Sequence, residues 1–339
     1  MRASGGETVQ TPTGEPGWQE SLLYIWHDTR AGIAGFHRLG LEPGAGDRGA
    51  GEQGTGGPGT GVGNAFCGLF TEDGLRYRWY RPEERDPDGV PGASTCAVGP
   101  LVIGLSPESS VTFTDDGVAV SLRFEDLQRE VRGELEEGDG GFRETGLASD
   151  HYEFTCRVRG SVRIGGRAME IDALGFRDHS WGVRDWSAIR AHRSCIGTLG
   201  PELSWSTLVM STPELGVTGR GLVLRKGELT MAASVDTVIH LEADGFTHRG
   251  GRCVIDLVDG TRLTLDLEVI DAWVYQLREF LSVEGICRIR LDGEPVDGFC
   301  LLEASNNPRA GTHLPETCVR AAFAEGLSTS TADQLPAAR

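Results

Sequence analysis

The sequence predicts an all-β protein built from antiparallel sheets. Its commonest local pattern is a two-residue turn containing glycine, flanked by runs of alternating or β-branched residues. Asp-Gly and Gly-Gly turns supply the positive φ angles that tight hairpins require, and a period of two in the flanks favours strands. The long crossover helices that a Rossmann or TIM-type sheet needs are missing. With 339 residues, 39% of them hydrophobic, the chain can build a full core in one large or two medium domains.

Five hairpins are predicted along the chain. In order, they occupy residues 111–122, 160–171, 222–230, 253–267 and 286–302. Sheets of more than about ten strands usually close on themselves or split. We therefore expect two β-barrels rather than one large sheet. The boundary is expected near residues 175–186, in the middle of the chain.

Composition suggests how the chain is divided. Residues 43–63 are almost entirely Gly with Ala, Asp, Glu and Thr, so they cannot bury apolar area and are expected to form a disordered loop. One short helix is predicted over residues 315–326. The expected parts are a disordered N-terminus (1–17), a first barrel (18–190), a second barrel (191–310) and a C-terminal tail (311–339).

The net charge excludes several classes of partner. Lys and Arg together number 32 against 50 for Asp and Glu, which gives a net charge of −18 that repels phosphate backbones. Nucleic acid and anionic membrane surfaces are therefore not expected as partners. No run of about 18 apolar residues and no secretory signal is visible, so we expect no membrane span and a cytoplasmic location. The oligomeric state stays open.

The basic residues and the cysteines narrow the chemistry further. Lys226 is the only lysine among the 32 basic residues, a bias typical of GC-rich coding in a bacterium such as an actinomycete. It lies in a predicted hairpin turn, so lysine chemistry is nearly excluded and acid–base work is left to Asp, Glu and His. The eight cysteines form no C-x-x-C pair and are expected to be reduced and buried. Neither they nor the histidines show zinc-ligand spacing, so no metal site is predicted.

The densest group of ionisable and aromatic residues lies at 175–186, in the stretch Gly-Phe-Arg-Asp-His-Ser-Trp-Gly-Val-Arg-Asp-Trp. A carboxyl group beside an imidazole, as in Asp178-His179, gives a proton donor and acceptor that can be tuned near neutral pH. Trp181 and Trp186 could lower the local dielectric constant and stabilise positive charge. A structural interpretation stays open, in which a buried ion network pins the two barrels together through Arg177, Asp178, Arg184 and Asp185.

A second polar and aromatic group is predicted on a strand over residues 18–28. Alternation places Glu20, Tyr24 and Trp26 on one face, where they could line a cavity. The alternative is a solvent-facing strand with aromatic cover.

Two weaker candidates come from strand ends. Tyr152 lies in His151-Tyr-Glu153 at the start of a predicted strand, and Glu303 closes the last predicted strand. The remaining histidines, including His192, have no spaced partner and are expected to have structural or exposed roles. No G-x-S-x-G motif, no G-x-G-x-x-G motif after a predicted strand and no Cys/His nucleophile signature is present.

The block Gly-x-Arg-Asp-His-Ser-Trp-Gly-x-Arg-Asp-Trp resembles a hallmark of the tandem lipocalin-like proteins related to carotenoid 1,2-hydratase (hydroxyneurosporene synthase) and the AttH-like group. The strand over 18–28, the following Gly35-Phe-His-Arg38 and the ending Gly298-Phe-Cys-Leu-Leu-Glu303 resemble the same group. The resemblance spans about residues 18–308. It implies two lipocalin-like barrels in tandem, with a ligand cavity in or between them.

The same resemblance implies cofactor-free chemistry on a small apolar substrate. Water addition to a polyene is the reaction of the hydratases, and relatives in polyketide pathways carry out cyclisations, including Diels–Alder reactions. The Asp and His of the D-H-x-W-G block are thought to act in protonation, which maps onto Asp178 and His179 as catalytic residues.

The expected function is therefore that of a cofactor-independent hydratase, cyclase or isomerase of secondary metabolism, acting on a polyene, terpenoid or polyketide. The alternative is a lipid- or metabolite-binding protein without catalysis. The residues expected to bind the substrate are Glu20, Tyr24, Trp26, Tyr152, Arg177, Trp181, Arg184, Trp186 and Glu303.

Overall fold

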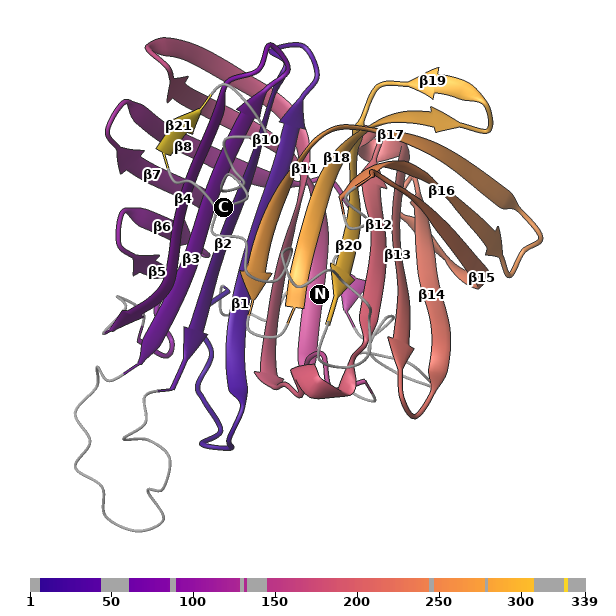
Figure 1. The fold of residues 1–339 in the computed structure, drawn as a ribbon, viewed down its shortest axis with the longest axis horizontal. Helices are drawn as coiled ribbons and strands as arrows, with labels where there is room; N and C mark the ends of the chain where they lie inside the picture. Colours follow the sequence, from indigo (N-terminus) through magenta and orange to yellow (C-terminus); the bar gives the residue numbers. More distant parts are fainter. Residues whose placement is uncertain are drawn as a thin grey trace.

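The computed structural model describes residues 7–43, 61–85, 90–128, 131–132, 145–243, 247–277, 280–307 and 326–328. Within these ranges the protein is all β, as the sequence predicts, apart from two short 3-10 helices, η1 (Trp186–Ala188) and η2 (Gly200–Glu202). The strands form two antiparallel sheets that lie side by side (Figure 1). No helical segment in these ranges is long and apolar enough to cross a membrane.

The first sheet curls into a nearly closed barrel, here called barrel 1 (Figure 1). Its hydrogen-bonded order is β21-β4-β3-β2-β1-β11-β10-β8-β7-β6-β5, and β9 pairs with β10. The strands are β1 (Trp18–Asp28), β2 (Ile33–Glu42), β3 (Val62–Thr71), β4 (Arg76–Arg85), β5 (Thr95–Val98), β6 (Leu101–Gly104), β7 (Ser109–Asp115), β8 (Val118–Asp126), β9 (Val131–Arg132), β10 (Asp150–Ile164), β11 (Arg167–Val183) and β21 (Gly326–Ser328).

The second sheet is a closed barrel, here called barrel 2. Its order is β17-β16-β15-β14-β13-β12-β20-β18-β19, and an additional pairing of β17 with β18 closes the circle. The strands are β12 (Ala191–Thr198), β13 (Leu203–Thr212), β14 (Gly216–Arg225), β15 (Glu228–Leu241), β16 (His248–Leu257), β17 (Arg262–Leu277), β18 (Phe280–Leu291), β19 (Glu294–Val296) and β20 (Phe299–Asn306).

All five predicted hairpins are confirmed. They join β7 to β8, β10 to β11, β14 to β15, β16 to β17, and β18 to β19. Their turns use the positive φ angles that the sequence suggests, and even the non-glycine residues Lys226 and Asp292 adopt φ of 51°. Local turn chemistry therefore fixes most of the strand pairing. Lys226 itself is exposed at its turn, as predicted, and pairs with Glu202.

The segment from Glu7 to Gly17 differs from the expected disordered N-terminus. Val9 is buried in the core of barrel 1, and its amide donates a hydrogen bond of 2.8 Å to the carbonyl of Ala93. The amide of Gln10 donates to the carboxylate of Glu20. These hydrogen bonds and the buried Val9 side chain fix the segment against barrel 1, although its composition predicts disorder.

Two other expectations fall partly or wholly outside the described residues. Residues 62 and 63, assigned to the Gly-rich loop from composition, are the first residues of β3, while residues 44–60 of that loop are not described. The helix predicted over 315–326 also lies outside the described residues, except for Gly326, which begins β21.

The barrels pack against each other through an inter-barrel core. Phe36 lies at its centre, with its ring centroid 5.5 Å from that of Trp273 and 5.4 Å from that of Tyr275 in barrel 2. Arg288 of barrel 2 also donates a hydrogen bond of 2.7 Å to Glu72 of barrel 1. The buried members of the inter-barrel core are Ile25, Ala34, Phe36, Phe66, Phe70, Phe176, Ile196, Trp273, Tyr275, Ile286, Phe299 and Leu301.

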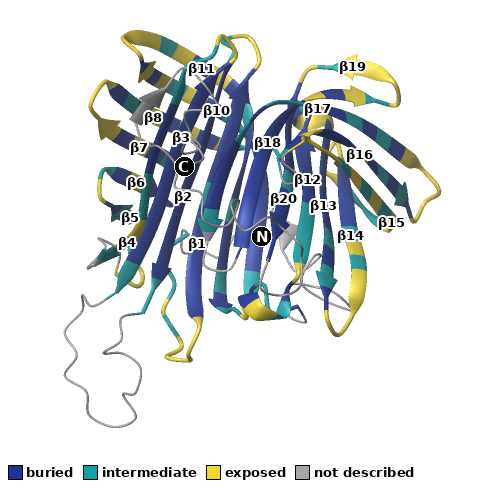
Figure 2. Ribbon diagram, viewed as in Figure 1, coloured by how far each residue is buried: buried dark blue, intermediate teal, exposed yellow. Residues whose placement is uncertain are grey.

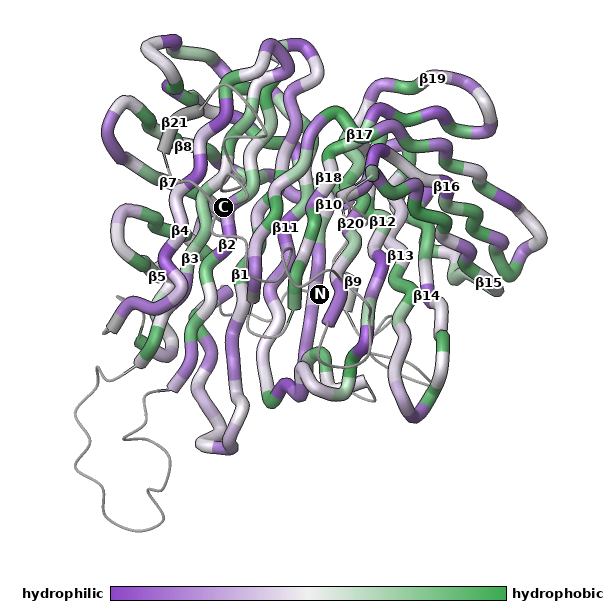
Figure 3. The backbone as a smooth tube through the Cα atoms, viewed as in Figure 1, coloured by the Kyte–Doolittle hydropathy of each residue, from purple (hydrophilic) through white to green (hydrophobic). Residues whose placement is uncertain are grey.

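As a result, the strands at the junction are buried on both faces, as the dark blue strands in the middle of Figure 2 show. Polar and apolar residues nevertheless alternate along many strands (Figure 3). On β1, Tyr24 and Trp26 point into the core of barrel 1, whereas Leu23 and Ile25 contact the inter-barrel core. The face that Glu20, Tyr24 and Trp26 were predicted to share is therefore in the interior of barrel 1, and it does not meet solvent.

We predict that Phe36→Ala lowers the free energy of unfolding by about 3–5 kcal/mol, because it leaves a cavity between two rigid barrels. Urea denaturation followed by tryptophan fluorescence measures this change. The control is Val217→Ala, at a side chain that is 74% exposed, which should change stability by less than about 0.5 kcal/mol. A small effect at Phe36 would contradict the proposed role of the inter-barrel core.

Candidate active site between the barrels

A cavity of about 130 Å³ lies between the two barrels. Barrel 1 contributes side chains from β1, β2, β10 and β11, and barrel 2 contributes side chains from β12, β13, β17, β18 and β20. Apolar side chains such as Leu23, Phe176 and Leu301 share the lining with carboxyl, imidazole, guanidinium and hydroxyl groups. The cavity therefore combines an apolar wall with a few polar groups, as binding sites for small molecules commonly do.

The central motif is divided between the two faces of β11. Successive residues of a strand point to opposite faces, so Asp178 and Ser180 line the cavity while Arg177 and His179 point into barrel 1. The neighbouring Asp178 and His179 are thus not brought together. Trp186, which follows the strand, also lines the cavity, and its Nε1 donates a hydrogen bond of 3.1 Å to Gln19.

Asp178 is the carboxyl group of β11 that faces the cavity. Its Oδ1 is buried and has no hydrogen-bond partner in the described part of the chain. Burial raises the pKa of Asp178 to about 6, although the nearby charges of His151 and Arg184 act in the opposite direction. A carboxyl group with this pKa can exchange a proton near neutral pH.

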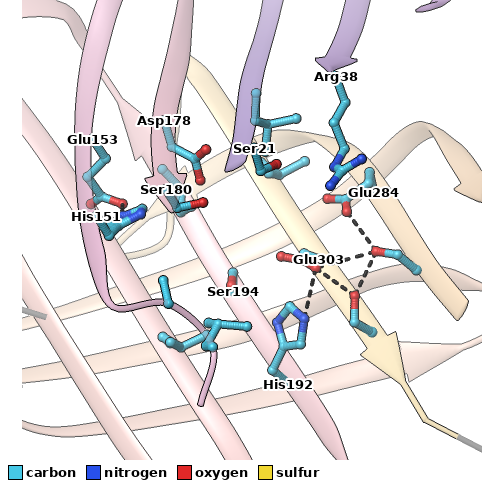
Figure 4. A pocket seen from close by; sticks show the side chains of 18 of the residues that line it. Ser21, Arg38, His151, Glu153, Asp178, Ser180, His192, Ser194, Glu284 and Glu303 are labelled. Carbon is cyan, nitrogen blue, oxygen red and sulfur yellow. Dashed lines mark hydrogen bonds and ion pairs between the residues drawn. The ribbon is translucent and has the colours of Figure 1, made fainter. Parts of the chain in front are cut away.

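The partner strand β10 supplies two more ionisable groups to the same wall. Glu153 is directly opposite Asp178 in the antiparallel register, and His151 is opposite Ser180. Nε2 of His151 lies 3.3 Å from Oε2 of Glu153. Figure 4 shows Asp178, Ser180, His151 and Glu153 together on one side of the cavity.

Arg184 lines the cavity near Asp178. It donates hydrogen bonds of 3.0 Å and 2.8 Å to the carbonyl and the hydroxyl of Ser180, while its buried Nε has no partner among the described residues. Burial, followed by the charge of Arg38, lowers the pKa of Arg184 to about 10. Its guanidinium therefore keeps one donor available to a molecule in the cavity.

The arginines and aspartates of the motif do not form one ion network. Arg177 pairs inside barrel 1 with Glu7 at 2.8 Å and with Asp126 at 3.0 Å. Asp185 accepts hydrogen bonds from the amide and the hydroxyl of Ser187 and caps η1. Neither residue reaches the cavity.

His179 belongs to a polar network in the interior of barrel 1. Its Nε2 lies 2.6 Å from Glu20, and its Nδ1 lies 2.7 Å from the hydroxyl of Tyr152 and 3.2 Å from Glu7. Burial opposes the charge on His179, but the hydrogen bonds to Glu20 and Glu7 outweigh it and raise the pKa of the imidazole. Burial likewise opposes ionisation of Glu7, yet its bonds to His179 and the charge of Arg177 lower its pKa to about 2.

Three further predicted residues lie in the same interior. Nε1 of Trp26 donates a hydrogen bond of 3.1 Å to His37, and the hydroxyl of Tyr24 lies 2.9 Å from that of Ser109. The ring of Trp181 packs 4.8 Å from that of His179. Of the predicted site residues, those in the cavity are Asp178, Arg184, Trp186 and Glu303, and those in barrel 1 are Glu20, Tyr24, Trp26, Tyr152, Arg177, His179 and Trp181.

Barrel 2 supplies a second group of polar side chains. Oε1 of Glu303 lies 3.3 Å from Nε2 of His192 and accepts a hydrogen bond of 2.6 Å from Ser305. Glu284 and Ser282 on β18 complete this wall (Figure 4). His192, expected to have only a structural or exposed role, thus lines the cavity.

Glu284, Arg38 and Tyr275 were not identified from the sequence as site residues. The usable signal is that Ser282 and Glu284 interrupt the apolar first part of β18, residues 280–287, at alternate positions. In the described parts of the chain, no three His, Cys, Asp or Glu side chains are grouped to hold a metal ion. The seven described cysteines are free and buried, as expected.

Comparisons with known proteins show which family and which solved structures this chain is similar to. A family model described as "Domain of unknown function (DUF7064)" matches residues 4–308. A search of curated proteins found no match. Among solved structures, a protein assigned as AttH from Nitrosomonas europaea is similar with a TM-score of 0.62 and 8% identity, over 89% of this chain and 98% of that one.

Two further solved structures share the fold. Kievitone hydratase from Nectria haematococca has a TM-score of 0.58 and 12% identity, over 89% of this chain and 97% of that one. CghA has a TM-score of 0.56 and 15% identity, over 92% of this chain and 96% of that one. At such identities the likeness establishes the fold, and it confirms the tandem lipocalin-like architecture that the sequence motif implied.

We predict that Asp178→Asn removes a pH-dependent loss of stability. A carboxyl whose folded pKa is raised from 3.8 to about 6 favours folding fully below pH 3.8, and this contribution is lost as the pH rises through 6. The wild type should therefore lose up to about 3 kcal/mol between pH 4 and pH 7 that the variant keeps. Urea denaturation at both pH values measures the difference.

The matched control is Asp172→Asn on the same strand. Asp172 pairs with Arg157 on the surface, and its pKa is lowered, so this variant should gain no stability at neutral pH. An equal response of the two variants would show that Asp178 is not a strained carboxyl.

We predict that His179→Ala lowers the free energy of unfolding by about 3 kcal/mol, because it leaves Glu20 buried without its partner. The matched control is His240→Ala on the exposed side of β15, which should change stability by less than about 0.5 kcal/mol. Thermal or urea unfolding measures both, and a neutral effect at His179 would contradict a structural role.

Proposed function

We propose that this chain, which belongs to the DUF7064 family, is an enzyme that transfers a proton to a small apolar molecule held between its two barrels. The observation that carries this proposal is the Asp178 carboxyl, which faces the cavity with a buried oxygen that has no partner among the described residues and with a pKa near 6. A group of this kind acts as a general acid when it is protonated and as a general base when it is ionised.

The proposed reactions are water addition, cyclisation and isomerisation. In water addition, Asp178 gives its proton to one carbon of a C=C bond, and the electron pair of that bond forms the new C–H bond. Water attacks the cation left on the other carbon and returns a proton to the Asp178 carboxylate. In cyclisation, a second double bond attacks the cation, and the carboxylate then removes a proton from the ring. No external cofactor enters either balance.

The surroundings of Asp178 fit such a role. Phe176, Leu301 and Trp186 provide an apolar and aromatic lining, which excludes water and can stabilise a passing positive charge. His151 and Glu153 on the neighbouring strand are placed to tune the carboxyl. His179 acts in this proposal as a positioning residue, because its bonds to Glu20 and Tyr152 fix β11 from inside barrel 1.

The comparisons support the reaction class and the kind of ligand. One neighbour in fold is named a hydratase, and another, CghA, has been solved with the small molecule Sch210972. We propose a polyene, terpenoid or polyketide as the substrate class, because such molecules offer the C=C bonds that a buried acid can protonate.

The test uses a variant as a substrate trap. Asp178→Asn keeps the shape of the side chain but cannot donate a carboxyl proton, so the variant purified from its own host should carry unconverted substrate. Extraction and mass spectrometry identify that molecule, which is then given to the wild type in H₂¹⁸O. Incorporation of one ¹⁸O indicates hydration, whereas a new compound of unchanged mass indicates cyclisation or isomerisation.

Turnover of the trapped molecule should fall by about 100-fold or more in Asp178→Asn, as is typical when a general acid is lost. It should also decline in the wild type as the pH rises above about 6, because the acid form disappears. The control Asp172→Asn should turn the molecule over normally. If both proteins carry the same molecule and neither converts it, the chain is a binding protein and the proposal fails.

A further inference from the structure

The barrel 2 wall of the cavity holds two carboxyl groups that the proposed proton transfer from Asp178 does not use. Glu284 on β18 and Glu303 on β20 are directly opposite each other in the antiparallel register. Ser282 joins them, with its hydroxyl 2.7 Å from Oε1 of Glu284 and 3.4 Å from Oε1 of Glu303. Two carboxylates this close repel each other, so one of them binds a proton readily.

The hydrogen bonds place that proton on a particular oxygen. Oε1 of Glu284 accepts from the hydroxyl of Ser282 at 2.7 Å and from that of Tyr275 at 3.2 Å. Oε2 is buried and has no partner in the described part of the chain. Because Oε1 is already occupied as an acceptor, a proton on this carboxyl resides on Oε2, where it is a donor without an acceptor.

The surroundings keep Glu284 neutral. Its side chain is 2% exposed, and burial, followed by the charge of Glu303, raises its pKa well above the usual range. The titratable and charged groups that face it are Glu303 on β20, Tyr275 on β17, Asp178 on β11 and Arg38 on β2, with His192 on β12 bound to Glu303.

Arg38 of barrel 1 lines the same cavity. Figure 4 shows its guanidinium group reaching toward Glu284 from barrel 1. Nη1 of Arg38 donates a hydrogen bond of 2.5 Å to Asn64, which fixes the side chain, and no ion pair joins it to Glu284 in the described structure. A neutral carboxyl from barrel 2 and an arginine from barrel 1 thus line the same cavity as Asp178.

We propose that Glu284 donates a hydrogen bond to an oxygen atom of the substrate, and that the substrate is therefore a neutral apolar molecule carrying a carbonyl or hydroxyl oxygen. This inference rests on the proposed function, because it places the oxygen across the cavity from the acid Asp178. A neutral carboxyl that donates a hydrogen bond in a water-poor site stabilises charge that develops on a carbonyl oxygen. Glu303 and Asp178 disfavour a ligand that carries its own carboxylate.

The test uses acetophenone and α-methylstyrene, which have the same shape and differ in having C=O or C=CH₂. Both probes are built on a single benzene ring, and apolar cavities of the same order of size as this one of about 130 Å³ are known to bind benzene. The full-length chain should bind acetophenone about tenfold more tightly in an NMR titration, which corresponds to one hydrogen bond. Infrared spectra should show the C=O stretch of bound acetophenone at lower wavenumber.

Two variants separate a donor from a merely structural carboxyl. Glu284→Gln keeps an N–H donor, so it should retain the preference for acetophenone and the shifted C=O stretch. Its preference should also persist at high pH, where ionised Glu284 in the wild type can no longer donate. Glu284→Leu should lose both the tenfold preference and the infrared shift, while the exposed control Glu228→Leu should change neither.

Equal affinity for the two probes, no binding of acetophenone, or a preference that survives in Glu284→Leu would overturn the inference. These results are distinguishable from failure of the proposed function. If acetophenone binds as described but the molecule trapped by Asp178→Asn is never converted, only the catalytic role of Asp178 fails. If the trapped molecule is converted but the two probes bind equally, only the oxygen site fails.

Discussion

The burial of β1 and of the second part of β11, residues 173–183, on both faces is the constraint on which the rest of the structure depends. One face of each strand completes the core of barrel 1, and the other meets barrel 2. Because side chains alternate, each residue belongs to one environment and its neighbour to the other. His179 is thereby locked to Glu20 inside the barrel, and Asp178, one residue earlier, is presented to the cavity by a strand that cannot shift.

The two polar groups on β11 differ in how well they are satisfied. His179, Arg177 and Glu7 form a buried network in which the charged groups are paired with one another and with Glu20. Disrupting such a network costs stability, but its groups are already bonded to each other and are not offered to a ligand. Asp178 and Glu284 instead each bury a carboxyl oxygen that has no partner among the described residues, which costs stability. Both of these carboxyl groups line the cavity, and this contrast supports the proposal that the proton transfer takes place there.

Much of the fold could be predicted because its information is local. Glycine turns and strands with a period of two specify the hairpins, and the length of the chain then requires closure into barrels. The docking of one barrel on the other could not be predicted, because a strand buried on both faces shows no simple apolar and polar sides. Adjacency in the motif predicts Asp178 and His179 as one donor and acceptor pair. In a β-strand, however, adjacent side chains point to opposite faces, so the two residues lie in different environments.

The polar side chains on the barrel 2 wall of the cavity were still harder to predict from the sequence. Glu284 and Glu303 meet because β18 pairs with β20 in one particular register, and His192 joins them from β12. None of these residues lies in a motif, and register between distant strands is set by turns and by burial of whole faces. The local trace they leave is Ser282 and Glu284 at alternate positions in the first part of β18, residues 280–287, where both faces of the strand are buried. A strand that must bury both faces has no solvent side for such residues, so their presence already indicates a cavity between two layers.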